Sequence, residues 1–285
     1  MRQYYPVLSI AGSDPSGGAG IQADIKTISA IGCYAMAAMT GLTAQNTTGV
    51  TAIEPVSPSM VKAQIDTIYA DIPPMAVKTG MLCDSAAAAA VAECLGHYRP
   101  SALVVDPVMV STSGCMLLKE DAVKVITTRI FPLATIITPN LHEARALTGE
   151  TDPDRQAAIL LDMGPQAVLI KGGDTDDTEY KTDYLYVRGA EPMSLRADAV
   201  DTSNTHGTGC TLSSAIASYL ALGYSLEDAV ADAKLYVTRA LEAGAFVTTG
   251  RGHGPVNHFF SPRRLKNFNP RNDERNHKRR TPHSA

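Results

Sequence analysis

The strongest constraint on the fold is a series of short apolar segments that alternate with longer helical patterns. Segments 102–105 and 167–170 read Ala-Leu-Val-Val and Ala-Val-Leu-Ile, without a polar residue. Continuously apolar strands are typical of a sheet that is covered on both faces. Because strands and helices alternate, we predict an α/β fold with a mostly parallel central sheet and helices on both faces.

Hydrophobic periodicity and turn residues divide the chain into elements. The predicted strands are 7–11, 35–40, 50–54, 75–78, 102–106, 134–138 and 167–171, with 183–188 and 193–196 as an antiparallel edge. The predicted helices are 21–31, 58–69, 84–97, 140–147, 209–220 and 225–244. No linker divides the body, so we predict one domain over residues 1–262, followed by a basic tail over 263–285 that is disordered.

Charge is distributed unevenly along the chain. The formal net charge is −4, but the tail carries eight Lys or Arg against two acidic residues, which leaves about −10 on the body. An acidic body opposes the binding of a polyanion, so a nucleic-acid partner is not expected. We expect the tail to be a solvated, dispensable end.

Cysteine usage and hydropathy indicate the compartment. The five cysteines are odd in number and scattered, without a CxxC pair, so they suggest neither a disulfide framework nor a zinc site. The first apolar run is too short for a signal peptide, and no run approaches the length of a membrane span. We therefore expect a cytoplasmic protein without a membrane partner.

Polar or glycine-rich clusters follow most of the predicted strands, and ligands of such sheets bind beyond the strand C-termini. Segment 12–20 has four glycines in nine residues, which suits either a backbone wrapped around a small ligand or a tight turn. It is neither a Walker A loop nor a GxGxxG motif. Asp24 could address a ring nitrogen or face solvent, Gln45 could read a heteroatom edge or cap a turn, and Met81 could line a pocket or the core.

Acidic and basic side chains follow the later strands. Asp106 ends an apolar run, where burial is costly unless the carboxylate has a role such as magnesium coordination. Asn140 and Glu143 fit either a magnesium–phosphate centre or a capping box. Lys171 precedes two glycines and could meet a phosphate.

Segment 204–211 reads Asn-Thr-His-Gly-Thr-Gly-Cys-Thr and opens an apolar helix. A helix N-terminus attracts anions, and its field lowers the pKa of a thiol such as that of Cys210. Together with the candidate magnesium carboxylates and glycine-rich loops, this anion hole predicts phosphoryl transfer, in which positioning and charge stabilisation dominate.

Seven ordered motifs resemble the hydroxymethylpyrimidine/phosphomethylpyrimidine kinases of thiamine biosynthesis, within the ribokinase-like superfamily. The matching segments are 11–24, 43–47, 78–82, 106–109, 138–144, 171–173 and 204–211, and 254–260 resembles that family's ending. The resemblance covers nearly the whole body and stops before the tail. It implies a ribokinase-like fold, ATP, Mg²⁺, a homodimer, and phosphorylation of 4-amino-5-hydroxymethyl-2-methylpyrimidine and then of its monophosphate.

The same resemblance implies roles for individual residues. The pyrimidine would contact Asp24, Gln45 and Val108, with Ala19 and Met81 along its wall. Magnesium would be governed by Asp106 and Glu143. The nucleotide phosphates would lie along Asn140, Lys171 and Gly172, near Thr205, and the anion hole would consist of Gly207, Thr208 and Gly209.

Cys210 stands where the wider superfamily usually has an aspartate base. The resemblance implies that Cys210 faces the reacting hydroxymethyl group, and we expect a base or an orienting group rather than a covalent nucleophile. A packing role, with catalysis by the anion hole alone, is the alternative. Cys115 departs from the family, which commonly has an acidic residue there.

Three other functions compete with this interpretation. A pyridoxal or pyridoxine kinase would use the same scaffold, and pocket size separates the two rings poorly. A hydrolase with Cys210 as nucleophile and His206 as base would leave the acidic and lysine residues without a role. A non-catalytic ligand-binding protein would not need the magnesium and phosphate residues.

Overall fold

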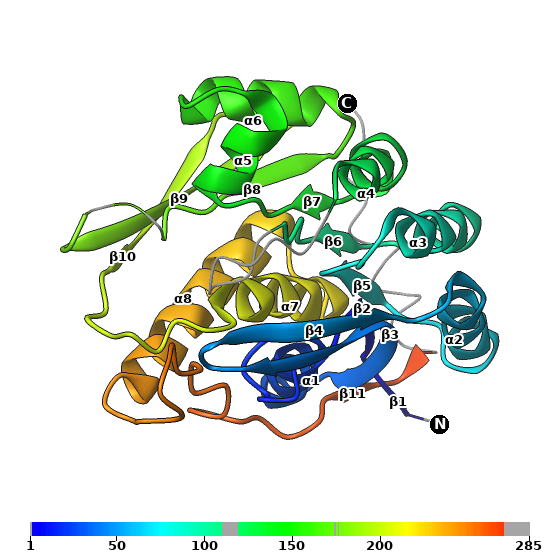
Figure 1. Ribbon diagram of the computed structural model, residues 1–285, viewed down its shortest axis with the longest axis horizontal. Coiled ribbons are helices and arrows are strands. Elements are labelled where there is room, and N and C mark those ends of the chain that lie inside the picture. The colour runs from blue at the N-terminus through cyan, green and yellow to red at the C-terminus, as the bar shows by residue number, and fades with distance from the viewer. Residues whose placement is uncertain (1, 110–118, 174, 176, 271–285) are drawn as a thin grey trace.

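The computed structural model describes residues 2–109, 119–173, 175 and 177–270. In these residues a nine-stranded mixed sheet forms the centre of the molecule, in the order β10-β9-β8-β7-β6-β5-β2-β3-β4 (Figure 1). Six neighbouring strands, from β8 to β3, run parallel, while β4, β9 and β10 are antiparallel to their neighbours. The predicted α/β class with a mostly parallel sheet is therefore confirmed.

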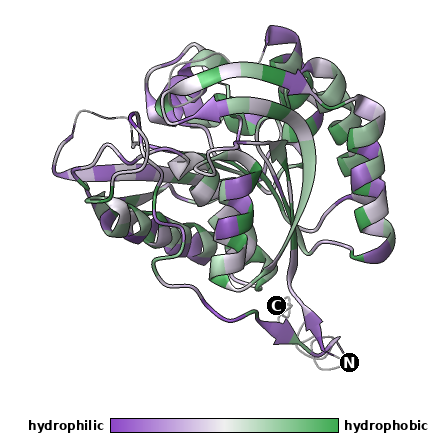
Figure 2. Cartoon of the chain, turned by 60° about the horizontal axis from the view of Figure 1, so that its bottom comes forward, coloured by the Kyte–Doolittle hydropathy of each residue, from purple (hydrophilic) through white to green (hydrophobic). Residues whose placement is uncertain are grey.

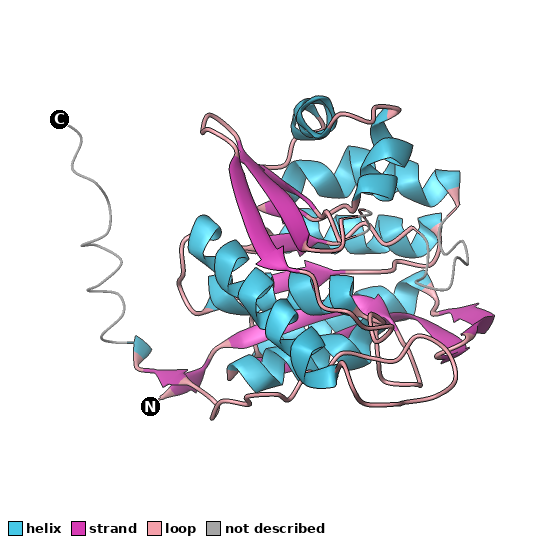
Figure 3. Cartoon of the chain, turned by 90° about the vertical axis from the view of Figure 1, so that its left-hand side faces the viewer, coloured by secondary structure: helices cyan, strands magenta, loops and turns pink. Residues whose placement is uncertain are grey.

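The strands of this sheet are short at its centre and long toward its ends. Their bounds are β2 (Pro6–Gly12), β3 (Tyr34–Asn46), β4 (Gly49–Pro55), β5 (Ala76–Thr79), β6 (Leu103–Val105), β7 (Ile136–Ile137), β8 (Ala167–Ile170), β9 (Tyr180–Val187) and β10 (Met193–Asp198). The antiparallel pairs β3–β4 and β9–β10 occupy opposite ends of the sheet (Figures 1 and 3).

Helices cover both faces of the sheet, and each face has its own apolar core. One face packs against α2 (Pro58–Asp71), α3 (Ser85–Tyr98), α4 (Glu120–Val125), α5 (Leu141–Thr148) and α6 (Pro153–Asp162). The other packs against α1 (Gly20–Ile31), α7 (Thr208–Ala221) and α8 (Leu226–Gly244). Side chains alternate along a strand, so β6 sends Leu103 and Val105 into the first core and Val104 into the second. The covering helices mix hydrophobic and hydrophilic residues along their length (Figure 2).

Local signals explain where several helices begin. Ser57 accepts a hydrogen bond from the backbone of Met60, and Pro58 occupies the first helical turn of α2. Asp84 caps α3 through the backbone of Ala87 at 2.8 Å. Both starts agree with the sequence prediction, since each cap satisfies a backbone N–H that the helix leaves unpaired.

Other elements were not predicted. Helix α6 was missed although Asp152 and Pro153 form a standard start. Helix α4 continues into a π-helical turn, η1 (Ile126–Ile130), and a 3-10 turn, η2 (Phe131–Leu133). In the described part of the chain, no helix is both long and apolar enough to span a membrane.

The first residues of the expected tail lie against the body. Arg263 and Lys266 donate backbone hydrogen bonds to the carbonyls of Ala30 and Gly32. Strand β11 (Asn267–Phe268) then pairs with β1 (Gln3–Tyr4) in a separate two-stranded sheet. Disorder from residue 263 onward is thus wrong for residues 263–270, because backbone pairing holds them, and residues 271–285 lie outside the described chain.

Candidate active site

A cleft of about 830 Å³ opens at the C-terminal ends of the parallel strands. Its wall combines the loop after β2, the end of β3, the loops after β5, β6, β7 and β8, and the N-termini of α5 and α7. Thirteen of the fifteen predicted site residues line it: Ala19, Gln45, Met81, Asp106, Val108, Asn140, Glu143, Lys171, Thr205, Gly207, Thr208, Gly209 and Cys210. The chain thus brings polar groups from distant segments to one edge of the sheet, as expected for this class.

The N-terminus of α7 lies in the middle of this cleft. Its N-cap is Gly207, in the left-handed conformation with φ 82°. A Cβ at Gly207 would overlap the carbonyl oxygen of Gly18, so both the conformation and the close approach require glycine. At Gly209 a Cβ would lie 3.4 Å from Lys171 Nζ and 3.6 Å from Asp106 Oδ2. Glycine is therefore required at position 207, whereas at position 209 it brings the backbone of α7 close to both charged side chains.

Cys210 is half-buried in the first turn of α7. Burial raises the pKa of its thiol to about 11, although Lys78 acts in the opposite direction. The nearby carboxylates of Asp24 and Asp106 raise this pKa further. The expectation that the helix field lowers the pKa of this thiol is therefore wrong, because desolvation and negative neighbours outweigh it.

Asp106, Glu143 and Lys171 form a compact charged cluster beside α7. Lys171 Nζ lies 3.0 Å from Asp106 Oδ1 and 3.8 Å from Glu143 Oε2. Asp106 is 2% exposed and also accepts hydrogen bonds from Thr138 Oγ1 and Ser213 Oγ, each at 3.2 Å. Burial lowers the pKa of Lys171, but the two carboxylates together outweigh it and hold this pKa above its ordinary value, so the ammonium stays charged.

Glu143 both caps helix α5 and lines the cleft. It forms a capping box with Asn140, in which each side chain accepts a hydrogen bond from the other residue's backbone, at 2.8 and 2.9 Å. The capping alternative is therefore real, and it leaves Glu143 in the wall of the cleft. Burial raises the pKa of Glu143, Asp106 adds to that effect, and Lys171 opposes it. Among the described residues, no three His, Cys, Asp or Glu side chains form a complete metal-binding group.

Asp14 and His206 hold the glycine-rich loop against the segment that precedes α7. His206 Nε2 lies 2.8 Å from Asp14 Oδ2, and both residues are buried. Asp14 also accepts hydrogen bonds from the backbones of Gly18 and Ala19, at 3.1 and 2.8 Å. These contacts lower the pKa of Asp14 to about 2 against the opposing effect of burial. His206 Nε2 is also 3.5 Å from the Gln45 amide, so it borders the predicted pyrimidine wall.

Two predicted contacts are not where they were expected. Asp24 does not line the cleft: its side chain is fully buried and its oxygens accept hydrogen bonds from Ser9, Lys78 and Ser214. Gly172 is also buried, and its N–H donates to Asp183 Oδ1 at 2.9 Å, which leaves Gly173 in the wall instead. Both expectations need correction, because protein partners already satisfy these polar groups. The expectation for Cys115 falls outside the described residues.

Sequence reasoning missed several residues that shape the cleft. It assigned no role to Asp14 or to the pair formed by Asp183 and Lys234, whose Oδ2 and Nζ are 2.8 Å apart. An aspartate within a glycine-rich loop was a usable signal for Asp14, since such a carboxylate commonly accepts hydrogen bonds from nearby backbone N–H groups. The pair of Asp183 and Lys234 joins β9 to α8, and no local sequence pattern predicts it.

The arrangement does not favour a cysteine hydrolase. His206 directs Nε2 to Asp14 and Gln45, and in the described part of the chain no hydrogen bond joins His206 to Cys210. A hydrolase of this type needs its base within reach of the nucleophile.

A mostly parallel sheet with a helix N-terminus, two carboxylates and a lysine at its C-terminal edge is the arrangement of the ribokinase-like phosphotransferases. A family model described as phosphomethylpyrimidine kinase matches residues 14–257. The chain belongs to this family.

Individual relatives agree with this assignment. A hydroxymethylpyrimidine/phosphomethylpyrimidine kinase from Rhizobium meliloti (strain 1021) is 48% identical over 88% of this chain and 96% of its own length. The crystal structure of phosphomethylpyrimidine kinase from Clostridium difficile 630 superposes with a TM-score of 0.73 at 45% identity, over 83% of this chain and 99% of that one. The pyridoxal kinase from Staphylococcus aureus in complex with pyridoxal gives 0.82 at 33% identity, over 94% and 97%.

Proposed function

We propose that this chain transfers the γ-phosphoryl group of ATP to 4-amino-5-hydroxymethyl-2-methylpyrimidine and then to its monophosphate, in thiamine biosynthesis. One observation carries the proposal. A single cleft runs from Gln45 and Met81, past the N-terminus of α7, to Lys171 and Lys234. Its volume of about 830 Å³ is within the range of cofactor sites and can accommodate two ligands that meet at the helix terminus.

The N-terminus of α7 suits the site of transfer. Backbone N–H groups of Gly207 and Gly209 would stabilise the charge that develops on the transferred group. The N–H of Thr208, the third member of the expected anion hole, donates to the carbonyl of Thr205 at 3.2 Å in this structure. Lys171 adds a fixed positive charge beside them. Because these groups are held by the fold before substrate binds, little reorganisation is needed at the moment of transfer.

The acidic pair fits Mg²⁺. This ion usually keeps several waters and takes one or two protein carboxylates together with substrate phosphates, so a complete protein cage is not needed. Asp106 and Glu143 both line the cleft, both lie beside Lys171, and both carry the oxygen ligands that this ion prefers. They would hold the ion there. When bound, Mg²⁺ would neutralise charge on the phosphate oxygens.

Cys210 is proposed to orient the hydroxymethyl group. With a thiol pKa near 11, the thiolate is a minor species at neutral pH, which favours hydrogen bonding over proton removal. The side chain lines the cleft directly beside the proposed anion hole. If Cys210→Ala retained near-normal turnover, this role would be lost.

Pyridoxal is the second candidate substrate. It is supported by the likeness to the Staphylococcus aureus pyridoxal kinase in complex with pyridoxal, which is 33% identical over 94% of this chain. Both rings are small heteroaromatic alcohols, and a wall such as Ala19, Met81 and Val108 discriminates weakly between similar shapes.

A coupled ADP-release assay tests the function. We expect turnover with hydroxymethylpyrimidine and with its monophosphate, a lower kcat/KM with pyridoxal, and dependence on added Mg²⁺. Asp106→Asn protein, purified identically, controls for contaminating kinases and should lose at least about a hundredfold in kcat. A strong preference for pyridoxal would replace the first substrate, and no ADP with any of the three would refute the function.

We further propose a homodimer, which rests on the family resemblance, and a cytoplasmic location, which rests on the five scattered cysteines. Sedimentation should then give twice the chain mass of 30.2 kDa. A monomer at micromolar concentration would contradict the assembly.

A further inference from the structure

A fully buried ion pair lies behind Cys210, outside the cleft. Lys78 on β5 donates from Nζ to both carboxylate oxygens of Asp24 on α1, at 2.9 and 2.8 Å, and neither side chain has exposed surface. Neither residue lines the cleft. Replacing such a pair by apolar residues is often neutral or stabilising, so stability alone does not account for it. The pair lies directly behind Cys210, which suggests a role at the proposed reaction centre.

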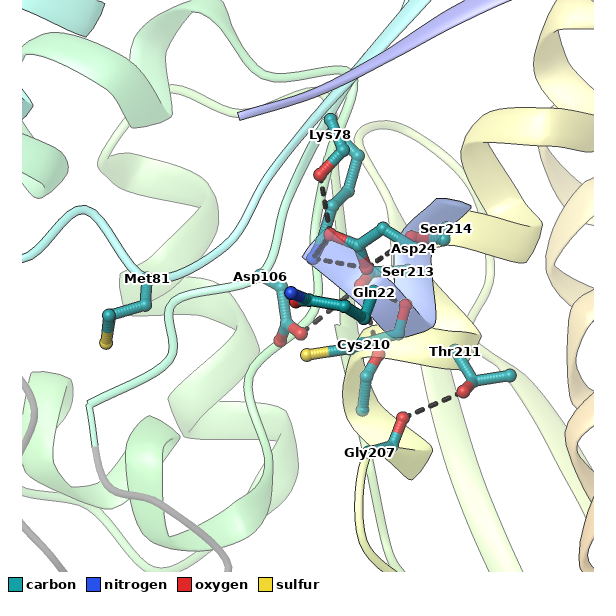
Figure 4. Close-up of polar contacts among 12 residues, drawn as sticks. Gln22, Asp24, Lys78, Met81, Asp106, Gly207, Cys210, Thr211, Ser213 and Ser214 are labelled. Carbon is teal, nitrogen blue, oxygen red and sulfur yellow. Dashed lines mark hydrogen bonds and ion pairs between the residues drawn. The ribbon is translucent and has the colours of Figure 1, made fainter. Parts of the chain in front are cut away.

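The pair is joined directly to α7. Ser214 Oγ donates to Asp24 Oδ1 at 2.7 Å, and Ser9 Oγ from β2 donates to Oδ2 at 2.5 Å. Ser214 follows Cys210 by four residues, so the two share one face of the helix. Figure 4 shows Asp24, Lys78 and Ser214 together, with Cys210 on α7, one helical turn before Ser214.

A second contact holds the adjacent side of the same helix. Ser213 Oγ donates to Asp106 Oδ2 at 3.2 Å. The start of α7 is thus fixed by two buried carboxylates, one in the cleft wall and one behind it (Figure 4). Hydrogen bonds to two carboxylates on different elements restrict both rotation and sliding of the helix.

We propose that the Asp24–Lys78 pair is a positioning device for phosphoryl transfer: through Ser214 it sets the rotation and depth of α7, and so the place of Cys210 and of the anion-hole N–H groups. Lys78 orients the Asp24 carboxylate through two hydrogen bonds, and Asp24 holds Ser214. This inference rests on the proposed function. A misplacement of about 1 Å at a reacting centre costs roughly a hundredfold in rate, so a contact that touches no substrate can control turnover.

Ser214 gives the mildest test because its side chain is small. Ser214→Ala removes the hydrogen bond to Asp24, whereas Ser214→Thr keeps a hydroxyl. We expect Ser214→Ala to lower kcat at least about tenfold, with KM for both substrates within about twofold, and Ser214→Thr to recover most of the loss. A role in stability alone would not move kcat for folded protein.

The charges are tested by Lys78→Met, Asp24→Asn and the combined variant. Each single change leaves an unpaired buried polar or charged group and should lower thermal stability, while the combined change should recover part of it. We expect kcat of the combined variant to stay at least about tenfold below wild type. Ile65→Ala, in the core on the other face of the sheet, is the control for destabilisation without loss of kcat.

The outcomes separate this inference from the function itself. Wild-type kcat in folded Ser214→Ala, or in the combined variant, would overturn the positioning role and leave the kinase function standing. Absence of ADP release by the wild-type protein with every substrate would overturn both.

Discussion

At the scale of single residues, burial decides the chemistry more than chain position does. Cys210 stands at a helix N-terminus, yet desolvation raises its thiol pKa to about 11. Asp14 is also buried, but hydrogen bonds from His206, Ser16 and Ala19 lower its pKa to about 2. The contrast follows from partners: the carboxylate has donors that stabilise its charged form, and the thiol has two acidic neighbours.

The reactivity of Cys210 should therefore rise late with pH. Alkylation by iodoacetamide requires the thiolate, so the rate at Cys210 should increase about tenfold per pH unit from pH 7 to 10 without reaching a plateau. Mass spectrometry of the Cys210 peptide gives this rate, circular dichroism verifies the fold at each pH, and a free thiol serves as reference. A midpoint below about pH 8 would show that the helix field prevails over burial.

At the scale of elements, α7 is the part on which the site depends. Its N-terminus provides the proposed anion hole, Ser213 and Ser214 connect it to two carboxylates, and most of its length is buried among α8, α1 and the strands β5 and β6. A helix so enclosed cannot shift to relieve a local clash, because protein interiors are close-packed.

Two glycines at opposite ends of α7 make a matched pair. Gly207 and Gly223 both have positive φ, 82° and 86°, but only Gly207 has backbone in the path of a Cβ. Gly223→Ala should cost about 1–2 kcal/mol in conformational strain, with kcat within about twofold. Gly207→Ala should lose stability too and, in addition, should lower kcat at least about a hundredfold, because the proposed anion hole must move.

Steady-state ADP release and urea unfolding measure both variants. Equal kcat losses in the two would show that strain in α7, and not displacement at Gly207, limits turnover.

At the scale of the whole molecule, segments distant in sequence close the structure at the edge away from the cleft. Residues 263–268 pair with Ala30, Gly32 and strand β1, and the ring of Phe268 packs on Tyr5 with centroids 4.9 Å apart. None of these residues lines the cleft. Their contribution is therefore expected to be one of stability rather than of turnover.

Two truncations separate the parts of the C-terminal segment. Removal of 271–285 should leave Tm and kcat unchanged, as predicted for a solvated, dispensable end. Removal of 263–285 loses several backbone hydrogen bonds, should cost about 2 kcal/mol, and should lower Tm by about 4–8 °C with kcat unchanged. Calorimetry distinguishes the two, and equal Tm values would show that residues 263–270 contribute nothing.

By itself, the sequence determined the fold class, most of the elements and the group of strand-end segments that meet in the cleft. These follow from local physics: apolar runs such as 167–170 make buried strands, Asp84 and Ser57 start helices, and parallel strands bring their C-terminal loops together. For that reason the amino-acid sequence alone places Asp106, Lys171 and Gly207 near one another.

Only the tertiary structure decided which of these side chains have partners other than substrate. Asp24 belongs to a buried ion pair, Gly172 donates to Asp183, and the thiol of Cys210 is protonated at neutral pH. Burial and hydrogen-bond partners are set by residues far away in the chain, such as Lys78 for Asp24. No pattern along one segment contains that information, because desolvation and pairing depend on the packing of several elements at once.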